Sequence, residues 1–308
     1  MRCWSCLEPG PDAGTLHRAC SERVFGSKTA PSIDVEVAKL HTVGLAMVGK
    51  TSISGVQRKV ALGFDAHRET LRVASEQPQF ILKPQATVYP HTAENELLTM
   101  VLATCCGIET APCALVALVD GEMAYITRRF DRTDEGKRAM EDFCQLALLP
   151  PKEKYSGSAE LCARIVHRYA SEPLIEMAKL FRLMAFGWWT GNGDMHLKNF
   201  ALLRGDDRRW RLSPAYDLLA TRLLIPGDRL ALPLGGRDDR LTRRHLLQYA
   251  DSCRLPKKAA TRILDELAER HDTLHDRIEA SPRPDDLRAA YHDLIDERLP
   301  SIAGRRTA

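Results

Sequence analysis

Three oxygen-bearing side chains stand at a spacing that could hold a metal ion beside a reacting hydroxyl group. Four residues separate Asp194 from Asn199 within Gly191–Phe200, and Asp217 follows at the end of Leu212–Asp217. In phosphoryl-transfer enzymes this spacing supplies a proton acceptor and a Mg²⁺ ligand, and a later Asp supplies a second ligand. An isolated Asp in a loop is usually a turn residue, but the Asn and the later Asp favour chemistry. The pattern predicts phosphoryl transfer, with Asp194 accepting the proton of the attacking hydroxyl.

A lysine at the end of an apolar segment could neutralise nucleotide phosphates. Lys83 follows the apolar run 80–82, which predicts a buried strand with the lysine at its end. Such a lysine is suited to the α- and β-phosphates of ATP, whereas the alternative is an ordinary exposed lysine. A carboxylate on the following helix should hold it. We expect Glu96 rather than Glu94 in this role, although acids at a helix start also interact with the helix dipole.

Three cysteines and a histidine near the start of the chain have the spacing of a zinc site. Cys3 and Cys6 form a C-x₂-C pair, and His17 and Cys20 follow after ten further residues. Tetrahedral Zn²⁺ takes such ligand sets, and a structural metal would stabilise a segment that has little to pack on its own. Free thiols on a loose terminus are the alternative. A redox pair is disfavoured because no βαβ pattern surrounds these residues.

The composition is that of a globular protein with a substantial core. The 308 residues are 44% hydrophobic, and 44 basic residues nearly balance 41 acidic ones, leaving a net charge of +3. This balance gives no argument for a nucleic-acid partner. The nine cysteines are an odd number without a secretory signal, which indicates a reducing compartment. Since there is also no apolar run long enough to cross a bilayer, we expect a cytoplasmic protein with no membrane contact.

The apolar periodicity predicts a β-rich first part and a helical second part. Strands are expected at 57–64, 71–73, 80–84, 113–119 and 123–129, and a later hairpin at 200–203 and 209–212. Helices are expected at 32–43, 91–106, 140–146, 158–169 and 174–190, and three more from Leu241 to the end. The helix at 91–106 should be strongly amphipathic and capped by Thr92. This order predicts an α+β fold of two lobes with a ligand between them.

Seven collinear segments resemble the successive sequence blocks of HipA-type serine/threonine kinases, the toxins of bacterial toxin–antitoxin systems. The segments are Ser52–Lys59, Phe80–Pro84, Arg129–Arg132, Glu141–Gln145, Lys154–Tyr155, Gly191–Phe200 and Leu212–Asp217. The resemblance implies the two-lobed protein-kinase-like fold of HipA. It divides the chain into a small cysteine knuckle at 1–27, a β-rich N-lobe at 28–135 and a helical C-lobe at 136–308. It also implies a serine/threonine protein kinase that uses ATP and Mg²⁺.

The resemblance assigns roles around the nucleotide. Asp194 and Lys83 are implied as catalytic residues, and Asn199 and Asp217 as Mg²⁺ ligands. The nucleotide-binding residues that it implies are Ser54, Gly55, Val56, Gln57, Lys83, Glu96, Arg128, Arg129, Phe130, His196, Asn199 and Asp217. His196 is given no proton-transfer role.

A paired-serine loop in front of the nucleotide site is the family's regulatory element. By resemblance, Ser52 and Ser54 are autophosphorylation sites, and each phosphate would add roughly −1.5 to −2 charge beside the nucleotide. Like charges would oppose ATP binding, so this phosphorylation should inhibit the kinase. Alternatively, both serines only satisfy the loop backbone.

The chain departs from the general kinase pattern in two places. It has no G-x-G-x-x-G loop, so the segment 52–57 must cover the phosphates, as it does in this family. Arg128 stands where the family commonly has an acidic residue. Backbone groups of Arg128–Phe130 should still meet the adenine, but a side-chain contact from position 128 is left open.

The short segment before the serine loop narrows the resemblance to the HipT branch. In that branch an extra subdomain is a separate protein, HipS, and a third protein, HipB, binds DNA. HipS-like and HipB-like antitoxins are therefore the expected partners, and the kinase itself needs no nucleic-acid contact. Known relatives phosphorylate glutamyl- or tryptophanyl-tRNA synthetase, so an aminoacyl-tRNA synthetase is the expected substrate. A secreted HipA-like kinase of some pathogens is a more remote resemblance, and no residue here marks secretion.

Two other classes of function stay open at this point. A pseudokinase could use the knuckle and the basic helices to hold an antitoxin or DNA, although the intact set of Lys83, Asp194, Asn199 and Asp217 speaks against it. Aminoglycoside and lipid kinases share the Asp-x₄-Asn logic but lack the serine loop. A nucleotide-binding assay with Mg²⁺ would distinguish a pseudokinase from a kinase. The serine loop distinguishes this chain from the small-molecule kinases, which lack it.

Overall fold

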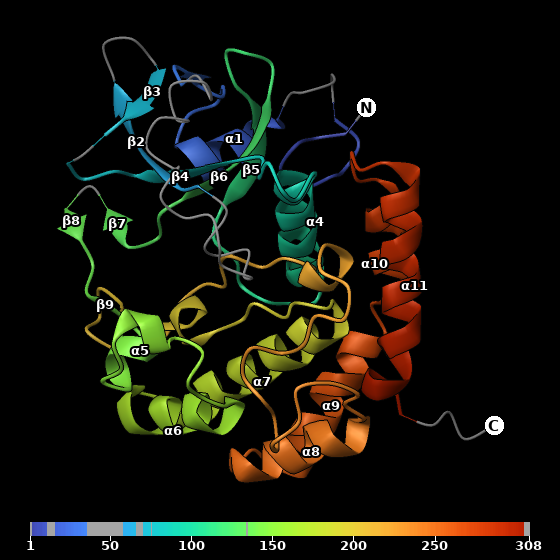
Figure 1. Ribbon diagram of the computed structural model, residues 1–308. Helices are drawn as coiled ribbons and strands as arrows, with labels where there is room; N and C mark the ends of the chain where they lie inside the picture. The colour runs from blue at the N-terminus through green and yellow to red at the C-terminus, as the bar shows by residue number, and fades with distance from the viewer. Residues whose placement is uncertain are drawn as a thin grey trace.

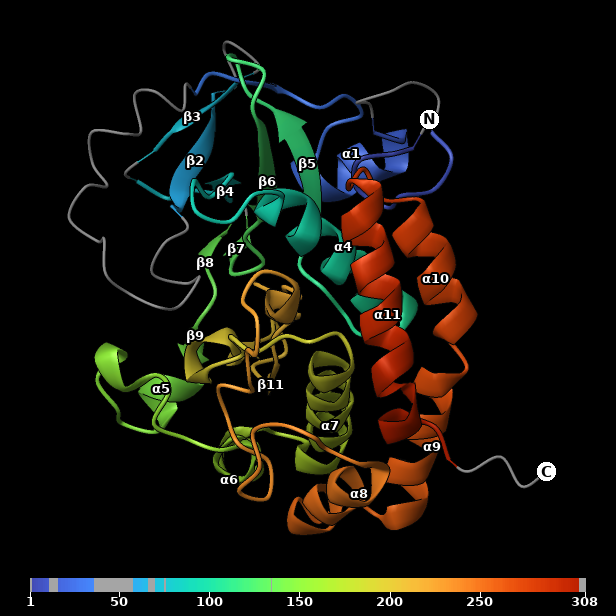
Figure 2. The same ribbon diagram turned by 45° about the vertical axis from the view of Figure 1, so that its right-hand side comes forward.

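A computed structural model of the chain describes residues 2–10, 16–35, 58–65, 70–74, 76–133 and 135–304. Figure 1 shows most of the strands gathered in the upper part of the molecule and most of the helices below them. Two C-terminal helices run along one side and reach from the lower part to the upper part, as Figure 2 also shows. The expectation of an α+β fold with a β-rich first part and a helical second part is confirmed.

A six-stranded sheet forms the β-rich part, in the order β1-β3-β2-β4-β6-β5. Its strands are β1 (Ser32–Ile33), β2 (Val60–Asp65), β3 (Thr70–Val73), β4 (Phe80–Pro84), β5 (Cys113–Ala117) and β6 (Met123–Arg128). All neighbours are antiparallel except β1 and β3, which are parallel. The expected strands are present, with ends displaced by up to three residues. Because β4 is a central strand, its last residues lie in the protein interior, with Lys83 opposite Tyr125 of β6.

Helix α4 (Thr92–Cys105) is buried on all sides, so the expectation of a strongly amphipathic helix is wrong. The sheet covers one side of α4 through β5 and β6, and α10 (His271–Glu279) packs on another. The expected cap is also wrong: the helix begins after His91, which has a left-handed backbone, and Thr92 is already helical. The Thr92 hydroxyl instead accepts the backbone N–H of Ala86 at 3.1 Å.

The second part of the chain is mainly helical. Its helices are α5 (Phe143–Leu146), α6 (Ala159–Tyr169), α7 (Pro173–Trp189), α8 (Arg243–Ser252), α9 (Lys257–Ala268), α10 and α11 (Asp285–Ile302). A three-stranded sheet of β9 (Met140–Asp142), β10 (Ala201–Arg204) and β11 (Trp210–Leu212) lies among them. A small ribbon joins β7 (Arg132–Thr133) to β8 (Gly136–Lys137), and short 3₁₀ turns occur at Pro151–Glu153, Leu197–Asn199 and Thr221–Leu223.

Three helix expectations need correction. Ser32–Ile33 is a strand paired with β3, and residues 36–43 of the expected helix lie outside the described residues. Met140–Asp142 is a strand paired with β10, and the helix begins only at Phe143, where the Asp142 side chain accepts the N–H of Gln145. Four helices, rather than three, follow Leu241, because the chain turns between α9 and α10 without a Gly or Pro to signal the break.

Two hydrophobic clusters hold these parts together. The larger one joins α4, α6, α7 and the C-terminal helices, and it includes Leu7 from the start of the chain. The smaller one lies against the sheet and includes Val24 of α1 (Arg18–Phe25). Since α4 packs against β5 and β6 and belongs to the larger cluster, the sheet and the lower helices share one core. Among the described residues, no helix is both long and apolar enough to cross a membrane.

Candidate active site

Lys83 and Glu96 form a buried ion pair between the sheet and α4. Lys83 Nζ lies 2.5 Å from Glu96 Oε1, and the two side chains are 4% and 0% exposed. The pair forms because the end of the central strand β4 faces the early turns of the buried helix. Glu94 contacts Gln85 instead. The structure therefore brings Glu96, rather than Glu94, against the lysine.

Asp217 joins this pair from the segment after β11. Lys83 also bonds to Asp217 Oδ1, and Lys59 Nζ reaches Asp217 Oδ2 at 2.9 Å. The side-chain amide of Asn199 donates to the same Oδ2 at 3.1 Å. Asp217 has a positive φ of 61°, a left-handed conformation that Asp tolerates better than most residues. Such backbone geometry persists where surrounding contacts fix it, as these three contacts do.

Burial and attraction compete in this network and shift three pKa values. Burial alone would lower the pKa of Lys83, but the Asp217 and Glu96 carboxylates outweigh it and raise that pKa. Burial would raise the pKa of Asp217, but Lys59 and Lys83 hold it well below its usual range. Burial raises the pKa of Glu96 to about 7, although the Lys83 ammonium pulls it down. Lys83 and Asp217 are therefore charged at neutral pH, and Glu96 titrates near it.

The loop after α7 presents Asp194 beside this network. Tyr155 donates its hydroxyl hydrogen to Asp194 Oδ1 at 2.7 Å, and the Asp194 N–H bonds to the Asn192 side chain at 3.2 Å. The His196 N–H donates to Asn199 Oδ1 at 3.1 Å, which turns the Asn199 side chain back onto the loop. Asp194 is half-buried, so it is held in place while its carboxylate stays reachable.

Two glycines are required by the path of this loop. Gly191 has φ of +70°, and a Cβ there would also approach Leu294 to 2.8 Å. At Gly193 a Cβ would lie 2.5 Å from the backbone oxygen of Arg229 and closer still to Asp228. A side chain at either position would push the loop away from its neighbours.

His196 lies in the same loop but is unsuited to carry a charge. Burial, and then the nearby Lys154 ammonium, lower the pKa of His196 to about 4. Its ring meets Tyr155 edge-on, with centroids 5.1 Å apart. A neutral ring packed on an aromatic side chain fits a positioning role rather than proton transfer at neutral pH.

A cavity of about 290 Å³ opens onto these charges. Its lining residues are Lys59, Ile81, Lys83, Glu96, Ala111, Thr127, Arg128, Arg129, Phe130, Asp131, Met140, Lys154, His196, Lys198, Asn199, Tyr216 and Asp217. An apolar wall beside clustered ammonium groups suits a ligand with a flat base and phosphates. The ionised carboxylate of Asp217 and the amide oxygen of Asn199, which has a second lone pair, are hard ligands that suit Mg²⁺.

A larger cavity of about 710 Å³ lies between α7 and α9. Its lining is mainly apolar and includes Leu174, Ala178 and Ile263. It has no convergent carboxylates, so the chemistry is assigned to the smaller, charged cavity.

One wall of the charged cavity is built by Arg128–Phe130. The Arg129 guanidinium binds both oxygens of Asp131 at 2.9 and 2.8 Å, so its charge is paired within the cavity wall. Phe130 packs against Tyr216, with ring centroids 5.7 Å apart. The expected residues Ser52, Ser54, Gly55, Val56 and Gln57 lie outside the described residues.

Sequence reasoning did not single out four side chains of this site. Lys59, Lys154, Tyr155 and Lys198 all reach it, and Lys198 also binds Asp142 at 2.6 Å. These residues could have been proposed for the site because each lies in a segment that resembles a HipA sequence block. Their individual roles depend on contacts between distant segments, which spacing alone does not give.

The knuckle residues are also brought together, at a separate place. Cys3, Cys6, His17 and Cys20 each offer a ligand atom, and these atoms all lie within 4.8 Å of one another. This cluster lies beside α1 and β5 rather than in the charged cavity.

Comparison with known families identifies a related domain. Residues 51–274 match the family model of the HipA-like C-terminal domain. Two proteins of Sinorhizobium fredii, Y4dM and Y4mE, are 31% identical over 269 residues and 32% identical over 181 residues. A protein of Haemophilus influenzae is 28% identical over 205 residues. All three are named as putative kinases.

These relatives are longer than the region that matches. The matches cover 82%, 56% and 61% of this chain, but only 64%, 43% and 59% of Y4dM, Y4mE and the Haemophilus protein. The chain thus spans less than two thirds of the length of each.

Two solved structures share the fold. A chain of the Shewanella oneidensis toxin–antitoxin complex of HipA, HipB and operator DNA gives a TM-score of 0.73 at 20% identity, covering 86% of this chain and 70% of that one. The Helicobacter pylori proinflammatory kinase CtkA gives 0.56 at 13% identity, covering 75% and 90%. At this identity the likeness establishes the fold, which is mixed helix and sheet as in both of these proteins.

Proposed function

The chain belongs to the family of HipA-like C-terminal domains, and on this premise we propose that it is a toxin-type serine/threonine protein kinase that uses ATP and Mg²⁺. The observation that carries the proposal is the meeting of Lys83, Glu96 and Asp217 in one cavity, beside the loop that presents Asp194. Catalysis of phosphoryl transfer is mainly positioning and charge stabilisation. A preformed set of fixed charges supplies both.

Each charged residue has a role that follows from its place. Lys83, held by Glu96, neutralises the phosphates, and Lys59 and Lys198 add positive charge at the same wall. Asp217 and Asn199 would hold Mg²⁺, which would supply charge neutralisation on the transferred group. Asp194, oriented by Tyr155, accepts the proton of the attacking serine or threonine hydroxyl.

The base of the nucleotide fits the apolar part of the cavity. Ile81, Ala111 and Met140 line that part, together with the Arg128–Phe130 segment. Backbone groups of this segment are suited to the adenine edge, while Arg128 itself replaces the acidic residue common in the family. His196, neutral at physiological pH, packs at the phosphate end without transferring a proton.

Autophosphorylation of Ser52 and Ser54 is part of the proposal. Its support is the position of Lys59, seven residues after Ser52, which binds Asp217 inside the cavity. Seven extended residues span at most about 25 Å, so the tether to Lys59 limits how far either serine can lie from the cavity. Gly55, Val56 and Gln57 would cover the phosphates in the unphosphorylated form. Phosphate on the loop would then oppose ATP by like charge.

The substrate class and the partners follow from the family rather than from the site. We propose that the acceptor is a serine of a bacterial protein, with an aminoacyl-tRNA synthetase as the leading class. The related Shewanella protein was solved with HipB and operator DNA, which supports a HipB-like antitoxin as a partner. A HipS-like protein and the short HipT-type organisation remain part of this proposal.

The test is phosphate transfer from γ-labelled ATP with Mg²⁺, using a panel of purified bacterial aminoacyl-tRNA synthetases. Asp194→Gln should lower transfer about 10²- to 10⁴-fold, the usual contribution of a general base. The matched control is Asp206→Gln, at an acid that is 76% exposed and should leave transfer unchanged. Transfer by Asp194→Gln near the unmutated rate would refute the assignment.

Intact-protein mass spectrometry of the same samples tests the assignment of the autophosphorylation sites. The double variant Ser52→Ala with Ser54→Ala should lack the main phosphorylated species of the unmutated protein. A phosphate that persists elsewhere as the main species would contradict the serine-loop assignment. Nucleotide binding without transfer to any acceptor would instead favour a binding module. Transfer to an aminoglycoside or a lipid would favour a small-molecule kinase.

A further inference from the structure

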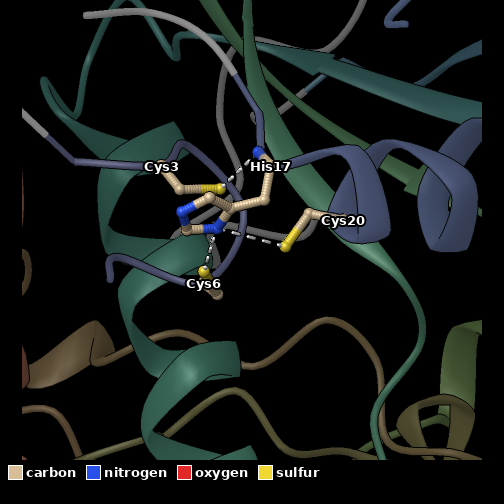
Figure 3. A group of neighbouring side chains, drawn as sticks. All are labelled: Cys3, Cys6, His17 and Cys20. Atoms are coloured by element: carbon tan, nitrogen blue, oxygen red, sulfur yellow. Dashed lines mark hydrogen bonds between the residues drawn. The ribbon is translucent and has the colours of Figure 1, made fainter. Parts of the chain in front are cut away.

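Three thiols and an imidazole meet near the start of the chain, and we propose that they form a structural zinc site that fastens α1 and the edge of the sheet. Figure 3 shows the side chains of Cys3, Cys6, His17 and Cys20 turned toward a common point, from a tight loop and from the start of α1. The site is separate from the charged cavity, so the inference does not depend on the proposed kinase activity.

The distances fit a tetrahedral ion with sulfur and nitrogen ligands. His17 Nδ1 lies 3.3 Å from Cys6 Sγ and 3.9 Å from Cys20 Sγ. Zinc–sulfur bonds of about 2.3 Å and zinc–nitrogen bonds of about 2.05 Å at tetrahedral angles would place nitrogen and sulfur about 3.6 Å apart. The two observed nitrogen–sulfur distances lie on either side of this value. All four ligand atoms fall within 4.8 Å of one another.

The hydrogen bond made by the other nitrogen of His17 shows which ring nitrogen would bind the ion. His17 Nε2 lies 2.8 Å from the backbone oxygen of Pro9. A carbonyl oxygen can only accept, so Nε2 carries the hydrogen and Nδ1 presents a lone pair to the sulfurs. Zinc-bound histidines commonly donate their second ring N–H in this way, which fixes tautomer and orientation.

The backbone around Cys3 and Cys6 has the form of a ligand loop. The Cys3 N–H donates to the Glu8 oxygen at 2.9 Å, and the Leu7 N–H donates to the Cys3 oxygen at 3.0 Å. Leu7 has φ of 59°, which closes the loop directly after the second cysteine. The His17 N–H points at Cys3 Sγ at 3.4 Å, a donor that would stabilise a thiolate.

A hydrogen-bonded group of free thiols explains this arrangement less well. A single Nδ1 lone pair accepts one hydrogen, yet two sulfurs approach that atom. No disulfide joins any of the three cysteines. One ion at the centre satisfies all four groups at once, and three thiolates with a neutral imidazole are a common set for structural Zn²⁺.

The contacts around the site indicate what the ion would hold in place. The Leu115 N–H of the edge strand β5 donates to the Trp4 oxygen at 2.8 Å, and the Ser5 hydroxyl donates to the Cys113 oxygen at 2.7 Å. Glu8 pairs with Arg277 of α10 on the other side. The knuckle loop therefore links the sheet edge to the C-terminal helices, and it covers an edge that would otherwise be open to pairing.

Helix α1 connects the same ion to the strand that carries Lys83. Cys20 lies in the first turn of α1, and Phe25 at its end meets Phe80 at the start of β4, with ring centroids 5.8 Å apart. Eight residues are too few for a helix that is stable alone, and His17 provides no side-chain cap. Zinc would therefore stabilise α1 and, through it, the first part of β4.

Metal analysis of the purified full chain tests the proposal without any variant. We expect about one zinc per chain by mass spectrometry, as one closed four-ligand site requires. A thiol-binding mercurial should release it, as measured by a colorimetric zinc indicator. Cobalt in its place should give intense visible bands of a tetrahedral thiolate site. A purified, folded protein that contains no zinc and takes up none when zinc is added would overturn the proposal.

Variants locate the ion. Cys20→Ser should lower zinc content about tenfold, since a neutral hydroxyl is a poor replacement for a thiolate. Cys105→Ser is the matched control, at a half-buried cysteine outside the cluster, and should keep its zinc. His17→Cys should also keep zinc, with a cobalt spectrum shifted toward four sulfurs. Should Cys20→Ser be insoluble, His17→Cys and the mercurial titration still decide; full zinc content in soluble Cys20→Ser would contradict the site.

A second group must be separated in the same measurement. His271, His275 and Asp296 could also hold a metal ion on the surface of α10 and α11. His275→Ala should leave the zinc content unchanged. If that variant, rather than Cys20→Ser, loses the metal, the ion belongs to the histidine group and the knuckle proposal fails.

Discussion

The charged cavity and the cysteine cluster are both assembled from distant segments, but they balance their charges differently. In the cavity, the ammonium groups of Lys59 and Lys83 face the carboxylates of Glu96 and Asp217, so the chain itself supplies both signs. The cysteine cluster consists of three thiols and one imidazole, whose ligand atoms all lie within 4.8 Å of one another. An outside cation is needed if the thiols ionise. The cavity therefore carries charges that already balance one another, whereas the knuckle would be completed by the proposed zinc ion.

The largest expected effect comes from a variant that should disable the charged cavity and leave the cysteine cluster intact. Lys83→Met removes the charge that holds Glu96 and Asp217, and a single lost electrostatic stabiliser costs about 10²- to 10³-fold in rate. We expect that loss in phosphate transfer, measured with saturating ATP, while the zinc content stays unchanged. The control is Lys258→Met, at an exposed lysine on α9. Cys20→Ser should show the reverse pattern, with lost metal and a lower melting temperature; matching losses in both variants would mean that the two regions do not act separately.

The parts of the site that sequence could predict are those that are local. Asp194, Asn199 and Asp217 lie on one loop and just after one hairpin. The structure places Asn199 and Asp217 in one cavity with Lys83 and Glu96, and Asp194 on the same loop as Asn199. Likewise, the short spacing of Cys3 and Cys6 and of His17 and Cys20 was enough to expect one cluster.

The parts that sequence missed depend on distant contacts. Lys59 meets Asp217 across 158 positions, and Tyr155 meets Asp194 across 39. Helix α4 looked amphipathic because nothing in residues 91–106 reveals that α10 covers its second side. The same limit explains β9, whose residues Met140–Asp142 are extended only because β10 pairs with them. Tertiary pairing decides these segments, and local propensity does not report it.

The pH dependence of stability sharpens the picture of the cavity. Burial raises the folded-state pKa of Glu96 to about 7 from 4.5, so the folded state binds more protons than the unfolded state between these values. Stability from this group is then present below pH 4.5 and is lost as pH rises through 7. Glu96→Gln removes the effect, so its stability relative to the unmutated protein should rise by about 2 to 3 kcal/mol between pH 5 and 8.

Urea unfolding of both proteins at each pH is the measurement, and the difference between them isolates Glu96. This matters because burial lowers the pKa of His196 to about 4 from 6.5, which gives stability that is lost as pH falls through 4. That opposite slope is present in both proteins and cancels. Glu109→Gln, at an exposed glutamate, is the control. If the unfolding free energy changed equally with pH in Glu96→Gln and Glu109→Gln, the buried pair of Lys83 and Glu96 would not govern the pH dependence of stability.

The smallest expected effect concerns the orientation of Asp194 by a hydrogen bond from Tyr155, which carries no charge. Tyr155→Phe removes the 2.7 Å hydrogen bond to Asp194 and leaves the ring that packs on His196. A hydrogen bond to a charged group is worth about 1.5 kcal/mol, so transfer should fall roughly tenfold. Because Tyr155 acts through Asp194, kcat should fall while the KM for ATP stays constant. Tyr169→Phe, at a tyrosine at the end of α6, should change neither constant. A rise in KM at constant kcat would place Tyr155 in nucleotide binding instead, and the orientation of Asp194 would then rest on the loop backbone alone.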